Sequence, residues 1–186
     1  MGLTYISTGT AGATISFTGI DDTYNEYQFH LINIHGETND KSLGFQVDTG
    51  SDTDYDQPMT TTFFQAFNNE DGTLASNTGG AGSAYSTGND QATSGDGNGV
   101  FSKILKDQGA DDTDQSGSGI LTLYAPASTV YMKHFITRAH MTQSSEYAQQ
   151  VFTAGYIHTT SAITSIQFKF DSGAIDAGEI HMYGVG

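Results

Sequence analysis

Several residue types are scarce or absent in this sequence of 186 residues, and each absence excludes a class of protein. Cysteine is missing, which excludes a disulfide framework and thiolate chemistry. Lysine and arginine together number 6 against 21 acidic residues, so the formal net charge is −15 and no nucleic-acid partner is expected. No apolar run approaches the length of a membrane span, so no membrane partner is expected either.

Helix-forming surface residues are also scarce, because lysine, arginine and glutamate are few and most of the acidic residues are aspartate, which favours turns. The chain is rich in what remains: it has 23 glycines, 11 phenylalanines and 10 tyrosines. Disordered chains are poor in aromatic residues. This composition therefore predicts a folded, β-rich protein with polar loops.

The N-terminal residues show no targeting pattern. They have neither the basic flank nor the long apolar core of a secretory signal. Ile6 stands where the myristoylation pattern requires serine or threonine. We therefore expect the chain to be made and folded in the cytoplasm.

Alternation of apolar and polar residues predicts most of the secondary structure. In 27–35 the apolar phase changes near Leu31 and Ile32, which indicates a bulge or a strand covered on both faces. Roughly eight to ten short strands, separated by turns rich in glycine, aspartate and serine, predict an all-β, antiparallel sandwich or barrel forming one domain over 1–186. The candidate strands are 13–19, 27–35, 43–48, 60–67, 120–125, 130–141, 149–158, 163–170 and 178–184, with 100–106 as a strand or a single helical turn.

Residues 68–99 interrupt this pattern. Leu74 and Tyr85 are their only large apolar residues, so the segment cannot bury enough surface to offset its ordering entropy alone. Two interpretations stay open: a long surface loop, or an extension that a neighbouring subunit holds in place.

The densest acidic run is 48–56, in which Asp52, Asp54 and Asp56 alternate with other residues. Alternate aspartates can place several oxygens around Ca²⁺. The EF-hand pattern fails, because Gln57 stands at the required glycine and Phe63 at the required glutamate. We favour a solvated turn in which the aspartates cap backbone amides, with a looser Ca²⁺ loop as the alternative and no other cofactor. The same two interpretations, a capped turn or a Ca²⁺ loop, apply to the shorter acidic run with Asp111, Asp112 and Asp114.

Catalytic motifs find no support in the sequence. The 6 histidines have no zinc-motif spacing, and no Gly-x-Ser-x-Gly elbow is present. Two carboxylates could meet in space as in a glycosidase, but nothing selects such a pair. We therefore expect a protein that is not an enzyme, in which most histidines are sheet-surface or partly buried imidazoles, although distant strands could bring His30 and His134 together.

The C-terminal run from Ala162 to Val185 resembles the ending of many tailed-bacteriophage virion proteins. That ending has an apolar strand, a Ser-Gly-x-Ile turn, a glycine and a final strand closing in Leu-Tyr-Gly-Ile; here Met182 and Val185 replace the leucine and the last isoleucine. The run at 20–31 and Gly155-Tyr-Ile are also similar to the family, whereas the middle of the chain has no such likeness. The matching C-terminal positions are Ile163, Ile166, Phe168, Ser172, Gly173, Ile175, Gly178, Ile180, Tyr183 and Gly184.

The resemblance implies an antiparallel jelly-roll β-sandwich, often trimeric, that assembles with other virion proteins and carries no catalytic site. Our first hypothesis is a capsid decoration or cement protein, a homotrimer on the major capsid protein, which reaches its neighbours through 68–99 and 1–12. The second is a tail or fibre component that binds a host-surface glycan, with Tyr24, Tyr55 and Tyr85 stacking on sugars and the acidic run holding Ca²⁺. An enzyme acting on host polysaccharide is the third.

Overall fold

The computed structural model describes residues 2–51, 53–69, 83–85 and 100–186. All the regular structure in these residues is β-strand, and none of them form a helix long and apolar enough to cross a lipid bilayer. The strands are β1 (Leu3–Gly12), β2 (Ile15–Thr18), β3 (Glu26–Gly36), β4 (Lys41–Asp48), β5 (Met59–Asn69), β6 (Ser83–Tyr85), β7 (Ser102–Gln108), β8 (Gly117–Tyr124), β9 (Lys133–Gln143), β10 (Tyr147–Ile157), β11 (Ser165–Phe170) and β12 (Ile175–Val185).

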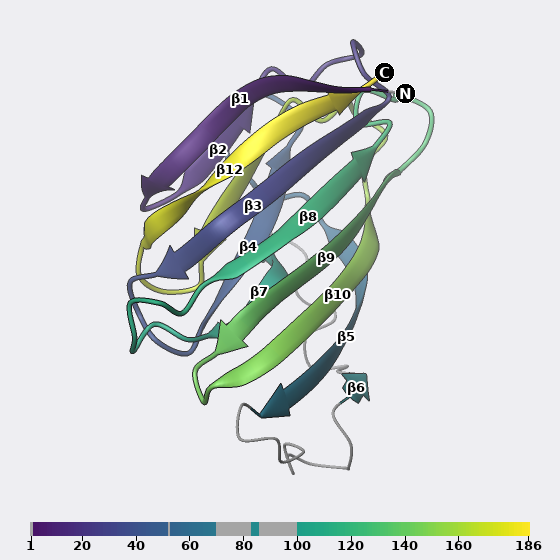
Figure 1. Cartoon of the computed structure of the whole chain (residues 1–186). Coiled ribbons are helices and arrows are strands. Elements are labelled where there is room, and N and C mark those ends of the chain that lie inside the picture. The colour runs from purple at the N-terminus through teal and green to yellow at the C-terminus, as the bar shows by residue number, and fades with distance from the viewer. Residues whose placement is uncertain (1, 52, 70–82, 86–99) are drawn as a thin grey trace.

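The strands form two layers that face each other (Figure 1). The front layer pairs in the order β1-β12-β3-β8-β9-β10-β5-β6, and the back layer in the order β2-β11-β4-β7. Every pairing is antiparallel. The layers join along one side where Gln108 of β7 pairs with Gln143 of β9, and on the other side β1 packs against β2, so the sandwich is nearly closed. The predicted all-β, antiparallel sandwich is confirmed.

The chain crosses repeatedly from one layer to the other. Consecutive strands change layer at every step from β1 to β5, again from β6 to β8, and again from β10 to β12. Eight strands make up the alternating part, as β1-β12-β3-β8 and β2-β11-β4-β7, while β5, β6, β9 and β10 extend the front layer. Four strands facing four is the arrangement of a jelly roll. The jelly-roll winding itself stays a prediction.

Aromatic side chains from both layers meet in the core. Phe29 of β3 lies with its ring centroid 5.4 Å from that of Phe17 and 5.6 Å from that of Phe168, both in the back layer. Phe45 of β4 meets Phe135 of β9 at 4.8 Å, edge to face. The sequence alternation matches the burial pattern clearly in β9, where buried and exposed residues alternate without a break from Lys133 to Met141.

A bulge interrupts β3 where the apolar phase changes. Asn33 has a φ of 49°, and the register against β8 shifts between Leu31 and Ile34. Gly178 of β12 lies opposite with a φ of 93°, and a Cβ there would come within 2.4 Å of the Asn33 carbonyl oxygen, so only glycine fits. The bulge predicted near Leu31 and Ile32 is confirmed.

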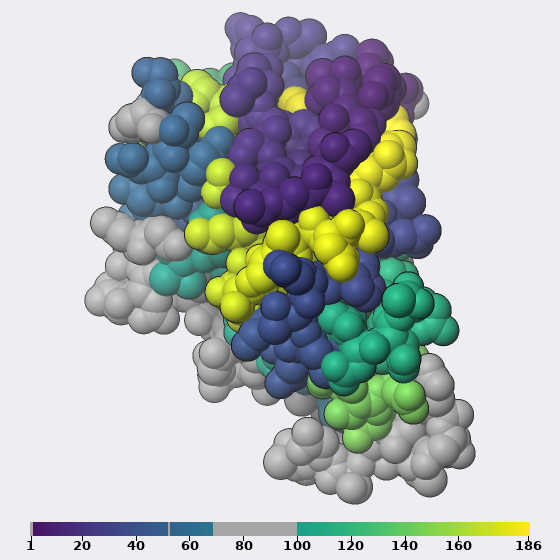
Figure 2. All heavy atoms as spheres, turned by 90° about the vertical axis from the view of Figure 1, so that its left-hand side faces the viewer, coloured from purple at the N-terminus to yellow at the C-terminus, as the bar shows by residue number. Residues whose placement is uncertain are grey.

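The ends of the chain form neighbouring strands. Residues 3–12, which alternation did not predict as a strand, pair with β12 as β1, and Figure 2 shows β1 and β12 side by side on the surface. The N-terminal segment is therefore part of the sheet, with a free edge, rather than a loose arm. The C-terminal run is scaffold as expected: Phe168, Ile180 and Met182 are buried, and Gly173 has a φ of 78° in the turn.

Two further predictions concern the middle of the chain. Of residues 100–106, which were predicted as a strand or a helical turn, 102–106 fall in β7 and form a strand. Most of the predicted loop 68–99 lies outside the described residues. Of its described parts, 68 and 69 end β5, and 83–85 form β6, which pairs with β5.

Candidate interaction surface

Charge is distributed unevenly over the molecule. The strands β5, β8, β9 and β10 lie side by side in the front layer and contain neither aspartate nor glutamate. Most acidic residues of the described chain lie in turns instead, for example at Asp40, Asp111 and Glu146 at one end of the sandwich and at Asp21 at the other. One half of the front sheet is thus free of negative charge in a chain whose formal net charge is −15.

The outward side chains of these four strands mix apolar and aromatic groups with polar and basic ones. Ile136 is 51% exposed, and Ile120, Tyr124 and Phe64 are exposed as well. Register places them together: Arg138 lies between Ile120 on β8 and Phe152 on β10, and Phe152 lies opposite Phe64 on β5. We call these outward side chains, together with the loop residues Val130, Tyr131 and Met132, the acid-free face; it is turned toward the viewer in Figure 1.

A row of flat groups crosses this face. The rings of Phe64 and Phe152 stack at 4.6 Å with an interplanar angle of 11°. The guanidinium of Arg138 lies over the Phe152 ring, 5.7 Å from its centroid. Packing across neighbouring strands fixes these side chains before any partner arrives, which lowers the entropy cost of binding.

The loop from β8 to β9 adds an ordered apolar tip. Val130 is 69% and Tyr131 73% exposed. The Ser128 hydroxyl oxygen accepts the backbone N–H of both residues at 3.2 Å, which fixes the turn that presents them. Lys133 ends the loop by turning inward, where its ammonium donates to the Thr159 carbonyl at 3.2 Å and burial lowers its pKa below the ordinary 10.5.

A shallow hollow of about 380 Å³ lies within the acid-free face. Tyr124, His134 and Tyr156 surround it, and the small side chains of Thr62 and Ala154 leave its floor open. A hollow ringed by aromatic groups is suited to receive one anchoring side chain from a partner.

Histidines lie mainly on the outward side of the front sheet, as the sequence predicted. His134 and His140 are exposed on β9, and His158 packs on Tyr156 at the end of β10. His30 and His134 do not meet; the histidine opposite His30 is His181 on β12. Burial lowers the pKa of His30 below the ordinary 6.5, and the charge of His181 lowers it further.

The acidic run predicted as a turn or Ca²⁺ loop is partly described. Asp52 lies outside the described residues. Asp54 is exposed, and the Asp56 carboxylate accepts from the Gln57 side chain at 3.1 Å. Asp48 is buried rather than solvated, and its carboxylate accepts the Thr49 backbone N–H at 2.7 Å. The described residues contain no cluster of three potential metal ligands. A Ca²⁺ site at Asp52, Asp54 and Asp56 stays a prediction.

The tyrosines proposed for sugar stacking are placed differently from that expectation. Tyr55 is only 7% exposed, so its ring cannot stack on a sugar. Tyr24 packs edge to face on Tyr27 and closely covers Gly184. The side chain of Tyr85 lies outside the described residues. The exposed tyrosines are Tyr124 and Tyr131 on the acid-free face and Tyr5 on β1.

A second hollow, of about 610 Å³, lies beside the β3 bulge. His35 lines it and holds the Asp176 carboxylate at 2.6 Å, while its other ring nitrogen lies 3.4 Å from the Asp112 carbonyl oxygen. Both nitrogens thus face oxygen acceptors, an arrangement that orients the imidazole but does not activate a hydroxyl nucleophile.

The acid-free face was not predicted from the sequence. One signal was present: the segments 117–143 and 147–157 contain no acidic residue at all, which is unusual in so acidic a chain. Comparison with protein-family models, with curated proteins and with solved structures finds no match for this chain. Among the described residues, most of the exposed large apolar side chains lie on the acid-free face, which makes it the candidate interaction surface.

Proposed function

We propose that this chain is a non-enzymatic structural protein of a bacteriophage virion, a capsid decoration protein that docks on the major capsid protein and on copies of itself through the acid-free face. The carrying observation is the exposed apolar surface on β8, β9, β10 and β5, free of acidic residues in a chain of net charge −15. Monomeric soluble proteins rarely expose large contiguous apolar patches.

The charge distribution supports the same proposal. Copies packed around a symmetry axis, as in a homotrimer, would repel one another if their acidic ends met. Contact through the acid-free face keeps the carboxylates of neighbouring copies apart. The C-terminal ending that resembles virion proteins and the four-plus-four strand arrangement add support.

The first test is the copy number per virion, measured by quantitative mass spectrometry of purified particles against the major capsid protein. A number commensurate with the capsid lattice is expected. A small number that matches tail symmetry would contradict decoration.

The second test adds purified protein to particles that lack it. Replacing Tyr131 and Ile136 together by serine should reduce bound protein at least about tenfold, since both are exposed anchors. The control replaces Leu3 and Tyr5, which are 52% and 56% exposed on β1, and should bind as the unchanged protein does when the acid-free face alone makes the contact. Weaker binding by this control would assign part of the docking to 1–12. Equal binding by all three proteins would exclude the acid-free face as the docking surface.

A tail or fibre component that binds a host-surface glycan is the second candidate. The observation that favours it is a polar cleft at the open side of the sandwich, described next. A low copy number together with glycan binding would establish this candidate in place of decoration.

A further inference from the structure

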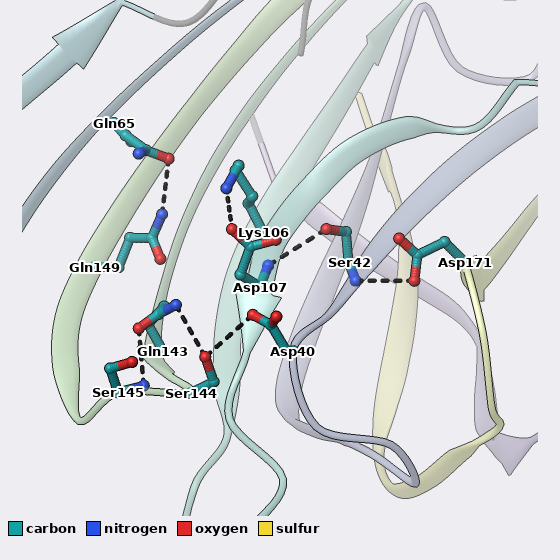
Figure 3. Close-up of polar contacts among 10 residues, drawn as sticks. All are labelled: Asp40, Ser42, Gln65, Lys106, Asp107, Gln143, Ser144, Ser145, Gln149 and Asp171. Atoms are coloured by element: carbon teal, nitrogen blue, oxygen red, sulfur yellow. Dashed lines mark hydrogen bonds and ion pairs between the residues drawn. The ribbon is translucent and has the colours of Figure 1, made fainter. Parts of the chain in front are cut away.

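A small cleft opens where the front layer extends past the last strand of the back layer. Its volume is about 70 Å³. Lys106 and Asp107 at the end of β7 form one wall, and inward side chains of β5 and β10, Gln65, Phe67, Tyr147 and Gln149, form the other. Figure 3 shows Gln149 and Gln65 on one side of this space and Lys106 with Asp107 on the other.

One group in the cleft has an unmet hydrogen-bonding requirement. Gln149 is only 3% exposed, and its amide nitrogen donates to the Gln65 side-chain oxygen at 2.8 Å. Its own oxygen has no partner and in Figure 3 turns away from Gln65. A buried acceptor without a donor is costly, so a hydroxyl or amide group is needed there.

The opposite wall carries both a donor and an acceptor in balanced charge. The Lys106 ammonium pairs with the Asp107 carboxylate. Asp107 is fixed in place, because its backbone N–H donates to the Ser42 hydroxyl at 3.3 Å and its carbonyl accepts the Ser144 N–H at 3.1 Å. An ion pair with no excess charge favours an uncharged ligand over a phosphate or a metal ion.

The cleft also has an aromatic side. The rings of Phe67 and Tyr147 stack with their centroids 6.2 Å apart and an interplanar angle of 25°. Aromatic surface next to convergent amide, ammonium and carboxylate groups is the combination that binds a molecule with one apolar and one polar side. The C–H face of a pyranose ring is apolar, and its hydroxyls both donate and accept.

We propose that this cleft binds the hydroxyl-bearing edge of one uncharged pyranose residue. A sugar hydroxyl donates to the Gln149 oxygen, other hydroxyls bond to Lys106 and Asp107, and the C–H face packs on Phe67 and Tyr147. A water needs roughly 10–15 Å³ of such space, so about 70 Å³ admits several hydroxyl groups, the edge of a single ring. This inference names a site for the second candidate function and holds on a head or on a tail.

The test is saturation-transfer NMR and calorimetric titration of the whole chain with five separate monosaccharides: glucose, galactose, mannose, rhamnose and N-acetylglucosamine. We expect saturable binding of at least one of them. No binding by any of the five, or a cleft that holds ordered water alone, would overturn the proposal.

Variants assign the binding to the cleft. Gln149→Met removes the unpaired acceptor at similar size, and Asp107→Asn removes the charge while tolerating the local φ of 55°. Each should weaken sugar binding at least about fivefold, as expected when one or two hydrogen bonds are lost. Tyr147→Ala removes the aromatic wall without touching the buried amides, and it should weaken binding similarly even if Gln149→Met fails to fold.

Two controls separate this site from the rest of the molecule. Gln167→Met, on the back layer, should bind sugar as the unchanged chain does. The serine replacements at Tyr131 and Ile136 should also leave sugar binding unchanged, so failure of the docking surface and failure of the cleft are distinguishable. Unchanged binding in all the cleft variants would contradict the assignment.

Discussion

Two parts of the front sheet, β3 with β12 and β8 with β9, β10 and β5, both turn apolar side chains toward the core. Their outward side chains differ. On β3 and β12 the outward groups are polar and bond to their neighbours: His30 lies 3.0 Å from the Gln28 side-chain oxygen, and His181 lies 2.8 Å from the Glu179 carboxylate. On β8, β9, β10 and β5 exposed apolar and aromatic side chains are mixed with histidine, threonine and arginine, and no acid lies among them. The first part is built to face water, and the second to be covered. The expected effects below run from the largest to the smallest.

The largest effect should separate the inner and outer residues of β9. Phe135→Ala should reduce the free energy of unfolding by about 3–5 kcal/mol, because it leaves a cavity against Phe45 in the core. Ile136→Ser, one residue along and exposed, should change that free energy by less than about 0.5 kcal/mol. Urea unfolding measures both. A large loss at Ile136 would show that the acid-free face is already covered within the monomer.

The next effect tests whether the absence of acid matters for docking. Ile136→Asp should weaken attachment to the particle by about 2 kcal/mol or more, since a carboxylate would be desolvated at the centre of the contact. Thr4→Asp, at an exposed site on β1, should not change it. Titration of labelled protein onto particles gives both affinities. If both variants attach equally, negative charge does not define the surface.

A smaller effect is expected from the order of the loop tip. Ser128→Ala removes the acceptor for the backbone N–H groups of Val130 and Tyr131. Without this bond the loop tip is more mobile in the free protein, and docking must order it. We therefore expect the free energy of attachment to weaken by about 0.5–1.5 kcal/mol. The melting temperature should change little, and amide exchange at Val130 should become faster. Attachment at full strength with faster exchange would show that the tip is not an anchor.

The effect expected for the polar strands β3 and β12 is a dependence of the free energy of unfolding on pH. The pKa of His30 is lower in the folded protein than its ordinary 6.5, so the unfolded chain takes up a proton first as the pH falls. Stability contributed by neutral His30 is therefore complete above about pH 6.5 and is lost as the pH falls toward the lower folded pKa. His30→Gln should flatten this slope in urea unfolding measured across the window. A slope that persists would assign it to His181 or another group.

The smallest effect concerns Ca²⁺. Because Asp48 already accepts the Thr49 backbone N–H and Asp56 the Gln57 side-chain amide, we expect millimolar Ca²⁺ to leave the melting temperature within about 1 °C, as for a ligand that does not bind the native state. A rise of several degrees that Asp54→Asn abolishes would establish the metal loop that includes Asp52 and Asp56. Mg²⁺ is the matched control ion.

Alternation in the sequence predicted most of the strands, because period-two burial shows directly in strands such as β9. It could not predict β1, whose serine, threonine and glycine residues carry little contrast between the two faces. Nor could it locate the acid-free face: Phe135 and Ile136 are both apolar, and alternation does not say which of two apolar neighbours has a layer packed over it. The cleft was further out of reach, since Gln65, Lys106 and Gln149 are distant in the chain and meet only through the pairing of β5, β7, β9 and β10.

The seam between β7 and β9 has a consequence for how the molecule opens. Neighbouring front strands share long ladders, whereas the two layers join there through one residue pair, Gln108 with Gln143, and two flanking backbone hydrogen bonds, Gly109 to Thr142 and Ser144 to Asp107. Amide hydrogen exchange should therefore begin at Gly109 and Ser144, well before the interior of β8 and β9 exchanges. Because Asp107 and Gln143 also line the cleft, each such local opening would change the spacing of its walls and with it the fit of any ligand bound there.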